Sequence, residues 1–114
     1  MAYDADLAVR IEAVLHGREA FSQRKMFGGV AYMLNGNMCV GIHKDWLVVR
    51  LAPETAASLL DQPGVKPFDI TGRPMKGWLL VAREAMGEAA QLSAWIERAE
   101  TFVAGLPPKK PKAK

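Results

Sequence analysis

The first regular pattern in the chain is that of an amphipathic helix. Four apolar residues are spaced so that they share one helical face: Leu7, Ile11, Val14 and Leu15. Asp4 can cap the start of this helix, because its side chain can accept hydrogen bonds from the free N–H groups of the first turn. Gly17 can end it, because glycine tolerates the left-handed conformation found at helix ends. The pattern therefore predicts a helix near the N-terminus.

Beyond the polar connector "REAFSQR", the pattern changes to apolar runs separated by short turns. Asn35-Gly36 lies between two such runs, and this dipeptide is a strong signal for a two-residue hairpin turn. Lys44-Asp45 separates the second run from a third in the same way. The stretch from Lys25 to Leu51 therefore predicts a meander of three antiparallel strands.

A two-residue loop fixes which residues oppose each other across a hairpin. With the first turn at Asn35-Gly36, Met33 opposes Met38 and Tyr32 opposes Cys39. One face of the meander is then uniformly apolar and is expected to be core: Met33, Met38, Val40, Ile42, Leu47, Val49 and Leu51. The opposite face has mixed chemistry: Gly28, Val30, Tyr32, Cys39, Gly41, His43, Trp46, Val48 and Arg50. We expect a site on this mixed face, although a bulge near Gly28-Gly29 would exchange the faces on one side.

The remaining elements follow from the same kind of pattern. A short helix is predicted over "APETAASLLDQPG", with Pro53 in its first turn and Pro63-Gly64 at its end. The run "KGWLLVA" suits a fourth strand, and a final helix is marked by its apolar spacing: Leu92, Trp95, Ile96, Ala99 and Val103. The order α-β-β-β-α-β-α predicts an α+β fold, in which about three helices cover one face of a mainly antiparallel, four-stranded sheet.

Length and charge limit the class of protein. The chain has 114 residues, 50% of them hydrophobic, which fits one domain at residues 1–106 followed by a disordered Pro/Lys tail at residues 107–114. The formal net charge is +3, but the tail holds four of the 15 basic residues, so the body has 11 basic against 12 acidic residues. A near-neutral body gives nucleic-acid binding only weak support.

Neither a membrane segment nor a disulfide is expected. No apolar run approaches the roughly 20 residues that span a bilayer, which excludes membrane insertion. The single cysteine, Cys39, cannot form an internal disulfide and fits a reducing compartment. We therefore expect a cytoplasmic protein.

The stretch "PFDITGRPMKGW" resembles a phosphate-binding loop in its glycine spacing. A P-loop, however, requires Lys and Ser/Thr directly after its last glycine and then a helix, whereas Gly77 is followed by Trp78 and a predicted strand. We interpret the stretch first as a structural connection. Its second interpretation is a contact surface, in which Arg73, Lys76 and Trp78 present two cations and an aromatic edge to an anionic or aromatic partner.

Catalytic arrangements find little support in the sequence. A nucleophilic Cys39 needs a nearby base, and His43 lies four residues along the same strand, roughly 13 Å away by strand rise. The two histidines and one cysteine have no metal-ligand spacing. We expect no enzyme activity, no cofactor and no metal.

Several motifs in a fixed order resemble a known family. They are Met-Phe-Gly-Gly at residues 26–29, the Asn-Gly hairpin, Arg-Leu-Ala-Pro-Glu at residues 50–54 and Gly-Arg-Pro-Met-Lys-Gly-Trp at residues 72–78. Together they resemble the N-terminal domain of the TfoX/Sxy family of bacterial competence regulators. The resemblance implies a compact α/β domain and supplies no catalytic residues. The family's namesakes also have a C-terminal domain, and we expect this chain to be a stand-alone copy of the N-terminal one.

Three functional hypotheses follow. The first is a non-enzymatic regulatory or protein-interaction module, with a role in transcriptional regulation and a protein partner or a second copy of the chain. The second is nucleic-acid binding by basic loop and tail residues. The candidate partner-binding residues are Lys25, Arg50, Arg73, Lys76 and Trp78. The third is a small-molecule pocket on the mixed face, with these candidate residues: Tyr32, Cys39, Trp46 and Arg50.

Overall fold

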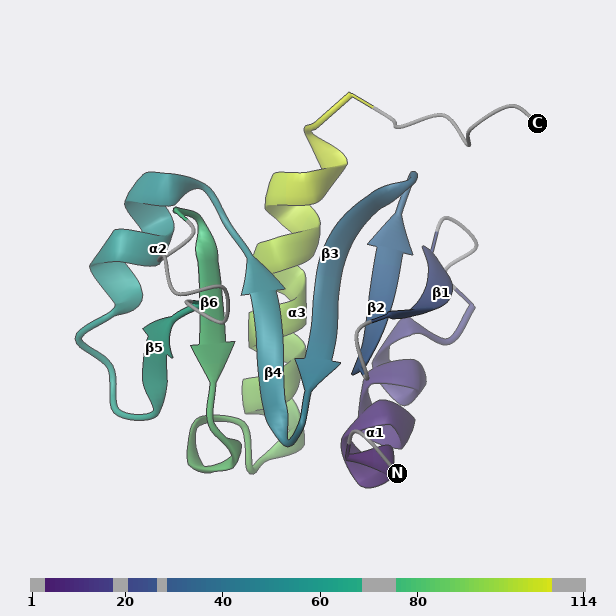
Figure 1. Ribbon diagram of the computed structural model, residues 1–114, viewed down its shortest axis with the longest axis horizontal. Coiled ribbons are helices and arrows are strands. Elements are labelled where there is room, and N and C mark those ends of the chain that lie inside the picture. Colours follow the sequence, from purple (N-terminus) through teal and green to yellow (C-terminus); the bar gives the residue numbers. More distant parts are fainter. Residues whose placement is uncertain (1–3, 18–20, 27–28, 69–75, 108–114) are drawn as a thin grey trace.

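The protein is an α+β domain in which helices cover one face of a six-stranded sheet (Figure 1). The computed structural model describes residues 4–17, 21–26, 29–68 and 76–107. The helices are α1 (Ala5–Leu15), α2 (Pro53–Leu59) and α3 (Ala89–Ala104), with a 3₁₀ turn, η1 (Arg83–Ala85). The strands are β1 (Phe21–Met26), β2 (Gly29–Leu34), β3 (Asn37–His43), β4 (Trp46–Arg50), β5 (Val65–Pro67) and β6 (Trp78–Val81).

The sheet is antiparallel between all neighbouring strands, in the order β1-β2-β3-β4-β6-β5. β1 to β4 form a continuous meander. The chain then passes through α2 to the far edge, forms β5, and returns as β6 between β5 and β4. The return places residues from β4, β5 and β6 side by side, although up to 34 positions separate them in the sequence.

The two predicted hairpin turns and the predicted Asp4 cap are confirmed, whereas α2 ends at Leu59, before the predicted end at Pro63-Gly64. Asn35 and Gly36 have φ angles of 54° and 85°, the left-handed values that a tight hairpin turn requires. His43 pairs with Trp46, so Lys44-Asp45 is also a two-residue loop. The Asp4 carboxylate accepts from the N–H groups of Asp6 and Leu7 at the start of α1.

The predicted number of strands is wrong: the sheet has six, not four. β1 contains the predicted connector sequence "FSQR", and it pairs with β2 along its whole length. An edge strand can carry polar residues because one of its sides meets solvent. β5, the other missed strand, has only three residues and therefore shows no period.

The predicted register of the first hairpin is correct at its turn and wrong beyond it. Met33 pairs with Met38, but Tyr32 pairs with Val40, so β3 contains one extra residue, Cys39, at this point. A bulge of this kind shifts the side-chain alternation of a strand by one position. The predicted exchange of faces therefore occurs, but at Cys39 rather than near Gly28-Gly29, and Tyr32 and Val30 belong to the core side.

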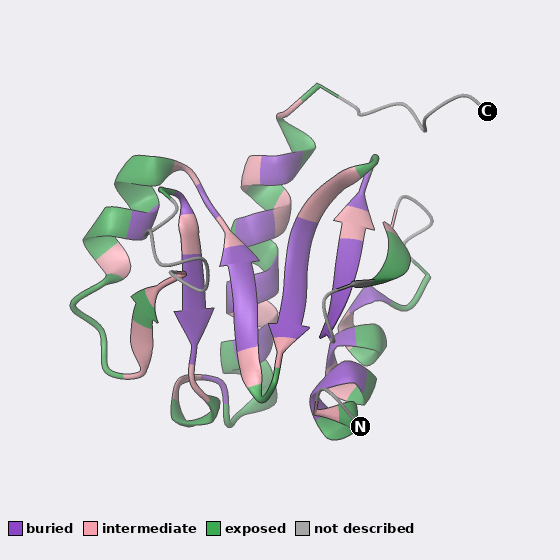
Figure 2. Ribbon diagram, in the orientation of Figure 1, coloured by how far each residue is buried: buried purple, intermediate pink, exposed green. Residues whose placement is uncertain are grey.

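All three helices contribute to one core on one side of the sheet. In Figure 1, α3 passes behind β3 and β4, and Figure 2 shows buried positions along the side of α3 that meets the sheet. Its buried residues are Leu92, Trp95, Ile96, Ala99 and Val103, as the sequence pattern predicts. No described helix covers the opposite side of the sheet, which we call the open face.

Candidate functional site: the open face of the sheet

The open face is built around one row of residues that crosses all six strands. The row consists of directly paired neighbours: Arg24, Ala31, Gly41, Val48, Leu80 and Lys66. The four central members are small or aliphatic and are buried, whereas the cations at the two ends are exposed. The face therefore has a low apolar floor with a positive charge at each edge.

At the centre of this floor, Gly41 has no side chain, and the surrounding atoms leave no space for one. A Cβ atom at this position would lie 2.8 Å from the carbonyl oxygen of Val30 and 2.8 Å from Cε of Met38. These separations are shorter than real Cβ contacts, so any side chain at position 41 would displace its neighbours. Met38 consequently lies over Gly41 on the open face.

Two tryptophans rise beside the floor, and each carries a cation over its ring. Lys66 Nζ lies 4.4 Å from the ring centroid of Trp46, and Arg50 Cζ lies 5.1 Å from that of Trp78. Such cation–π contacts stabilise a pair by about 0.5–1 kcal/mol at exposed sites. Phe68 adds a third ring, with its centroid 6.1 Å from that of Trp78. These groups are half-buried or exposed, so they are accessible to a partner.

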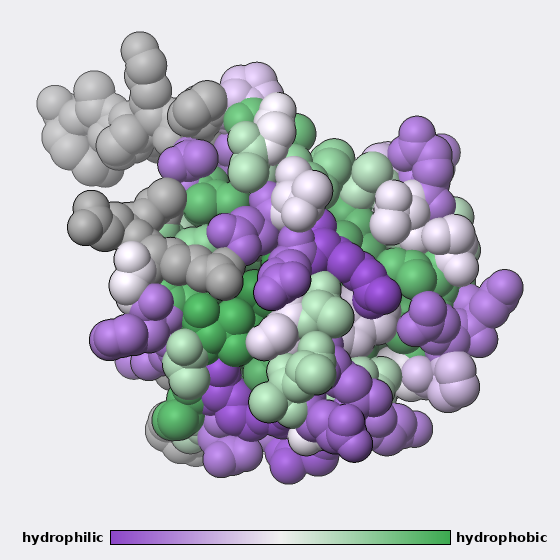
Figure 3. All heavy atoms as spheres, turned by 180° about the vertical axis from the view of Figure 1, so that it is seen from behind, coloured by the Kyte–Doolittle hydropathy of each residue, from purple (hydrophilic) through white to green (hydrophobic). Residues whose placement is uncertain are grey.

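Charge is segregated between the two layers of the fold. None of the described strand residues is acidic, whereas the strands contain Arg24, Lys25, Arg50 and Lys66. The three α-helices carry five acidic residues and two arginines: Asp6, Glu12, Glu54, Glu97, Glu100, Arg10 and Arg98. Figure 3 shows the helical side, where hydrophilic and apolar residues are interspersed. The near-neutral charge of the body, residues 1–106, therefore conceals a cationic sheet layer.

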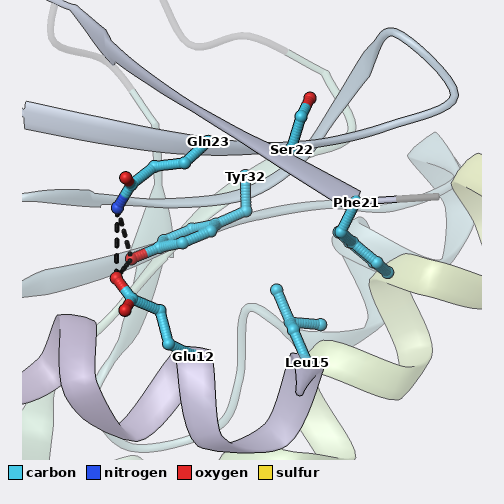
Figure 4. A pocket seen from close by; sticks show the side chains of 6 residues that line it. All are labelled: Glu12, Leu15, Phe21, Ser22, Gln23 and Tyr32. Atoms are coloured by element: carbon cyan, nitrogen blue, oxygen red, sulfur yellow. Dashed lines mark hydrogen bonds between the residues drawn. The ribbon is translucent and has the colours of Figure 1, made fainter. Parts of the chain in front are cut away.

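Two predicted pocket residues lie on the other side of the sheet. The Tyr32 hydroxyl donates to the Glu12 carboxylate at 3.0 Å, and Gln23 Nε2 donates to the same carboxylate at 3.1 Å (Figure 4). This cluster joins α1 to β1 and β2 beside a shallow hollow of about 270 Å³. Cys39 also belongs to the core, whereas Trp46 and Arg50 lie on the open face. The four residues proposed for one pocket therefore do not converge.

Cys39 is buried and chemically protected. Burial, together with the negative charge of Glu100, raises the pKa of its thiol to about 12, while Arg50 opposes the shift. His43 pairs with Trp46 on the open face, so the bulge leaves it on the opposite side of the sheet from Cys39. Among the described residues, no group of three or more His, Cys, Asp or Glu side chains is placed to hold a metal ion.

This raised pKa predicts a specific loss of stability at high pH. Because the unfolded thiol releases its proton near pH 9 and the folded thiol only near pH 12, the contribution of Cys39 is intact below pH 9. Above pH 9 the free energy of unfolding is expected to fall by up to about 1.4 kcal/mol per pH unit from this group alone. Urea unfolding of the native chain and of Cys39→Ala from pH 8 to pH 11 measures the difference. Equal slopes in the two proteins would contradict the prediction.

The predicted partner-binding residues are only partly brought together. Arg50 and Trp78 are directly paired on neighbouring strands, and Lys76 is exposed just before β6. Lys25 is exposed on the edge strand β1, three strands away from β4. Arg73 lies outside the described residues. The prediction missed Lys66 because β5 is too short to recognise as a strand.

A separate apolar groove lies between α2 and the β5–β6 edge. It has a volume of about 410 Å³, and its lining includes Ala56, Leu60, Pro67 and Trp78. Its only described charged side chains are Glu54 and Lys76. Trp78 therefore borders both this groove and the open face.

Comparison with known proteins identifies the class of this domain. Residues 13–103 match the family model of the TfoX N-terminal domain, so the chain belongs to that family. The resemblance drawn from the sequence motifs is confirmed, and family membership suggests a module of the competence-regulator type. No curated protein and no solved structure matches the chain. Within the described residues, no helix is long and apolar enough to cross a membrane.

Proposed function

We propose that this domain is a non-catalytic regulatory module that acts by binding a partner through the open face of its sheet. The observation that carries the proposal is the sheet face that no described helix covers, with its two cation–tryptophan pairs. Tryptophan and arginine are enriched among the residues that dominate binding energy at interfaces. Membership of a family of regulators supports the same role.

Photo-crosslinking in cell lysate tests which face meets the partner. A photoreactive benzoylphenylalanine replaces Trp46 on the open face, and in a matched variant it replaces Val9, which is 66% exposed on α1. Adducts are expected from position 46 and not from position 9. An adduct of twice the chain mass would identify a second copy as the partner.

The chemical class of the partner is then determined from the adduct at position 46. Sensitivity of the adduct to protease or to nuclease shows whether the partner is protein or nucleic acid. Equal adduct patterns at both positions, or none at position 46, would count against binding through the open face.

A further inference from the structure

We infer that the open face binds single-stranded DNA. This inference rests on the proposed function, because it names the partner of the same face. It begins from charge: Arg24, Arg50 and Lys66 lie on the open face, and the described strand residues include no acidic one. A polyanion is therefore the partner whose charge complements this face.

The geometry of the two cation–tryptophan pairs favours nucleotides over an acidic peptide. Trp46 and Arg50 stand at the two ends of β4, roughly 13 Å apart by strand rise. A stacked nucleic-acid strand advances by about 3.4 Å per phosphate, so this distance corresponds to about four nucleotides. Unpaired bases stack on aromatic rings and on guanidinium planes, whereas the carboxylates of a peptide gain nothing from a ring face.

The shape of the floor favours a single strand over a duplex. The row from Ala31 to Leu80 is low and apolar, with no described helix or ribbon standing out to enter a groove. Because the floor residues are themselves buried, bases meet the half-buried rings of Trp46 and Trp78 that border the floor. Arg24 and Lys66 at its edges can meet phosphates. Apart from Ser22 and His43, the described open-face positions lack a neutral polar side chain to recognise a ribose 2′-hydroxyl, so we assign the strand as DNA.

Fluorescence anisotropy of a labelled oligothymidylate of about 12 nucleotides tests the inference with the full chain. With about three phosphate contacts, affinity is expected to fall roughly 20-fold between about 50 and 200 mM salt. Oligomers shorter than about four nucleotides should bind much more weakly, because they cannot span both pairs. Tryptophan fluorescence should change on binding, since Trp46 and Trp78 contact the bases.

Two matched variants separate the open face from general charge. Arg50→Ala removes an arginine from the Trp78 ring on the open face, and Arg98→Ala removes one lying 4.8 Å from the Trp95 ring centroid on the helical side. Both change the net charge equally, and both keep the lysine tail. We expect roughly tenfold weaker binding for Arg50→Ala and no change for Arg98→Ala.

Several outcomes would overturn the inference. They are equal losses in the two arginine variants, tighter binding of duplex DNA or of the matching RNA, and equally effective competition by polyglutamate. Protein adducts at position 46 without single-stranded DNA binding would reject this inference and leave the proposed function standing. If neither adducts at position 46 nor binding of single-stranded DNA is observed, the open face is rejected as a binding surface.

Discussion

Gly77→Ala is expected to lower the free energy of unfolding by about 3 kcal/mol, the sum of two separate penalties. Gly77 has a φ angle of 86°, which costs an alanine backbone energy. A Cβ at this position would also lie 2.6 Å from the Leu51 carbonyl oxygen. The backbone cannot easily retreat, because the Gly77 carbonyl accepts a hydrogen bond from Leu51 N–H. Urea unfolding measures the effect.

Substitutions at two other glycines measure the backbone penalty and the steric penalty separately. Gly17 has a φ angle of 82° but nothing within 4 Å of its Cβ position, so Gly17→Ala should show the backbone cost alone, about 1–2 kcal/mol. Gly41 lacks the positive φ angle but has the close contacts, so Gly41→Ala should show the steric cost. A loss for Gly77→Ala no larger than that for Gly17→Ala would show that the chain relieves the clash.

Leu92→Ala is expected to cost about 3 kcal/mol, because it leaves a cavity where α3 packs against the sheet. Leu92 is 1% exposed and belongs to the central core. The same substitution at Leu60, which is 39% exposed, is the matched control and should cost less than about 1 kcal/mol. Thermal or urea unfolding of both variants gives the comparison. Equal losses would mean that α3 is not the main packing element.

The parts of the fold that sequence predicts well are those with local rules. The Asn35-Gly36 turn and the Asp4 cap each depend on the chemistry of one or two residues, and both occur as predicted. The bulge at Cys39 has no such rule, because "NMCVGIH" is compatible with either register. β1 was not predicted because its sequence is polar. A polar strand is compatible with the edge of a sheet, and only the folded structure shows that β1 lies there.

The candidate site was predictable residue by residue but not as an arrangement. Arg50, Trp46 and Trp78 could be selected from their chemistry alone. The residues that contact them could not be selected in this way. Lys66 lies near Trp46 only because β5 and β6 join the sheet beside β4. Tyr32 and Cys39 were assigned to the same face as Trp46, and one extra residue in β3 moved them to the other side.

The two edges of the sheet bear on how the protein behaves when it is concentrated. An uncovered strand edge is a template for pairing with another chain, which leads to fibrous aggregation. β1 presents Arg24 and Lys25 at one edge, and β5 at the other is three residues long and contains Lys66 and Pro67. Charge, shortness and proline all disfavour edge-to-edge pairing. The chain can therefore leave one face of its sheet without a helix among the described residues while resisting polymerisation through its own backbone.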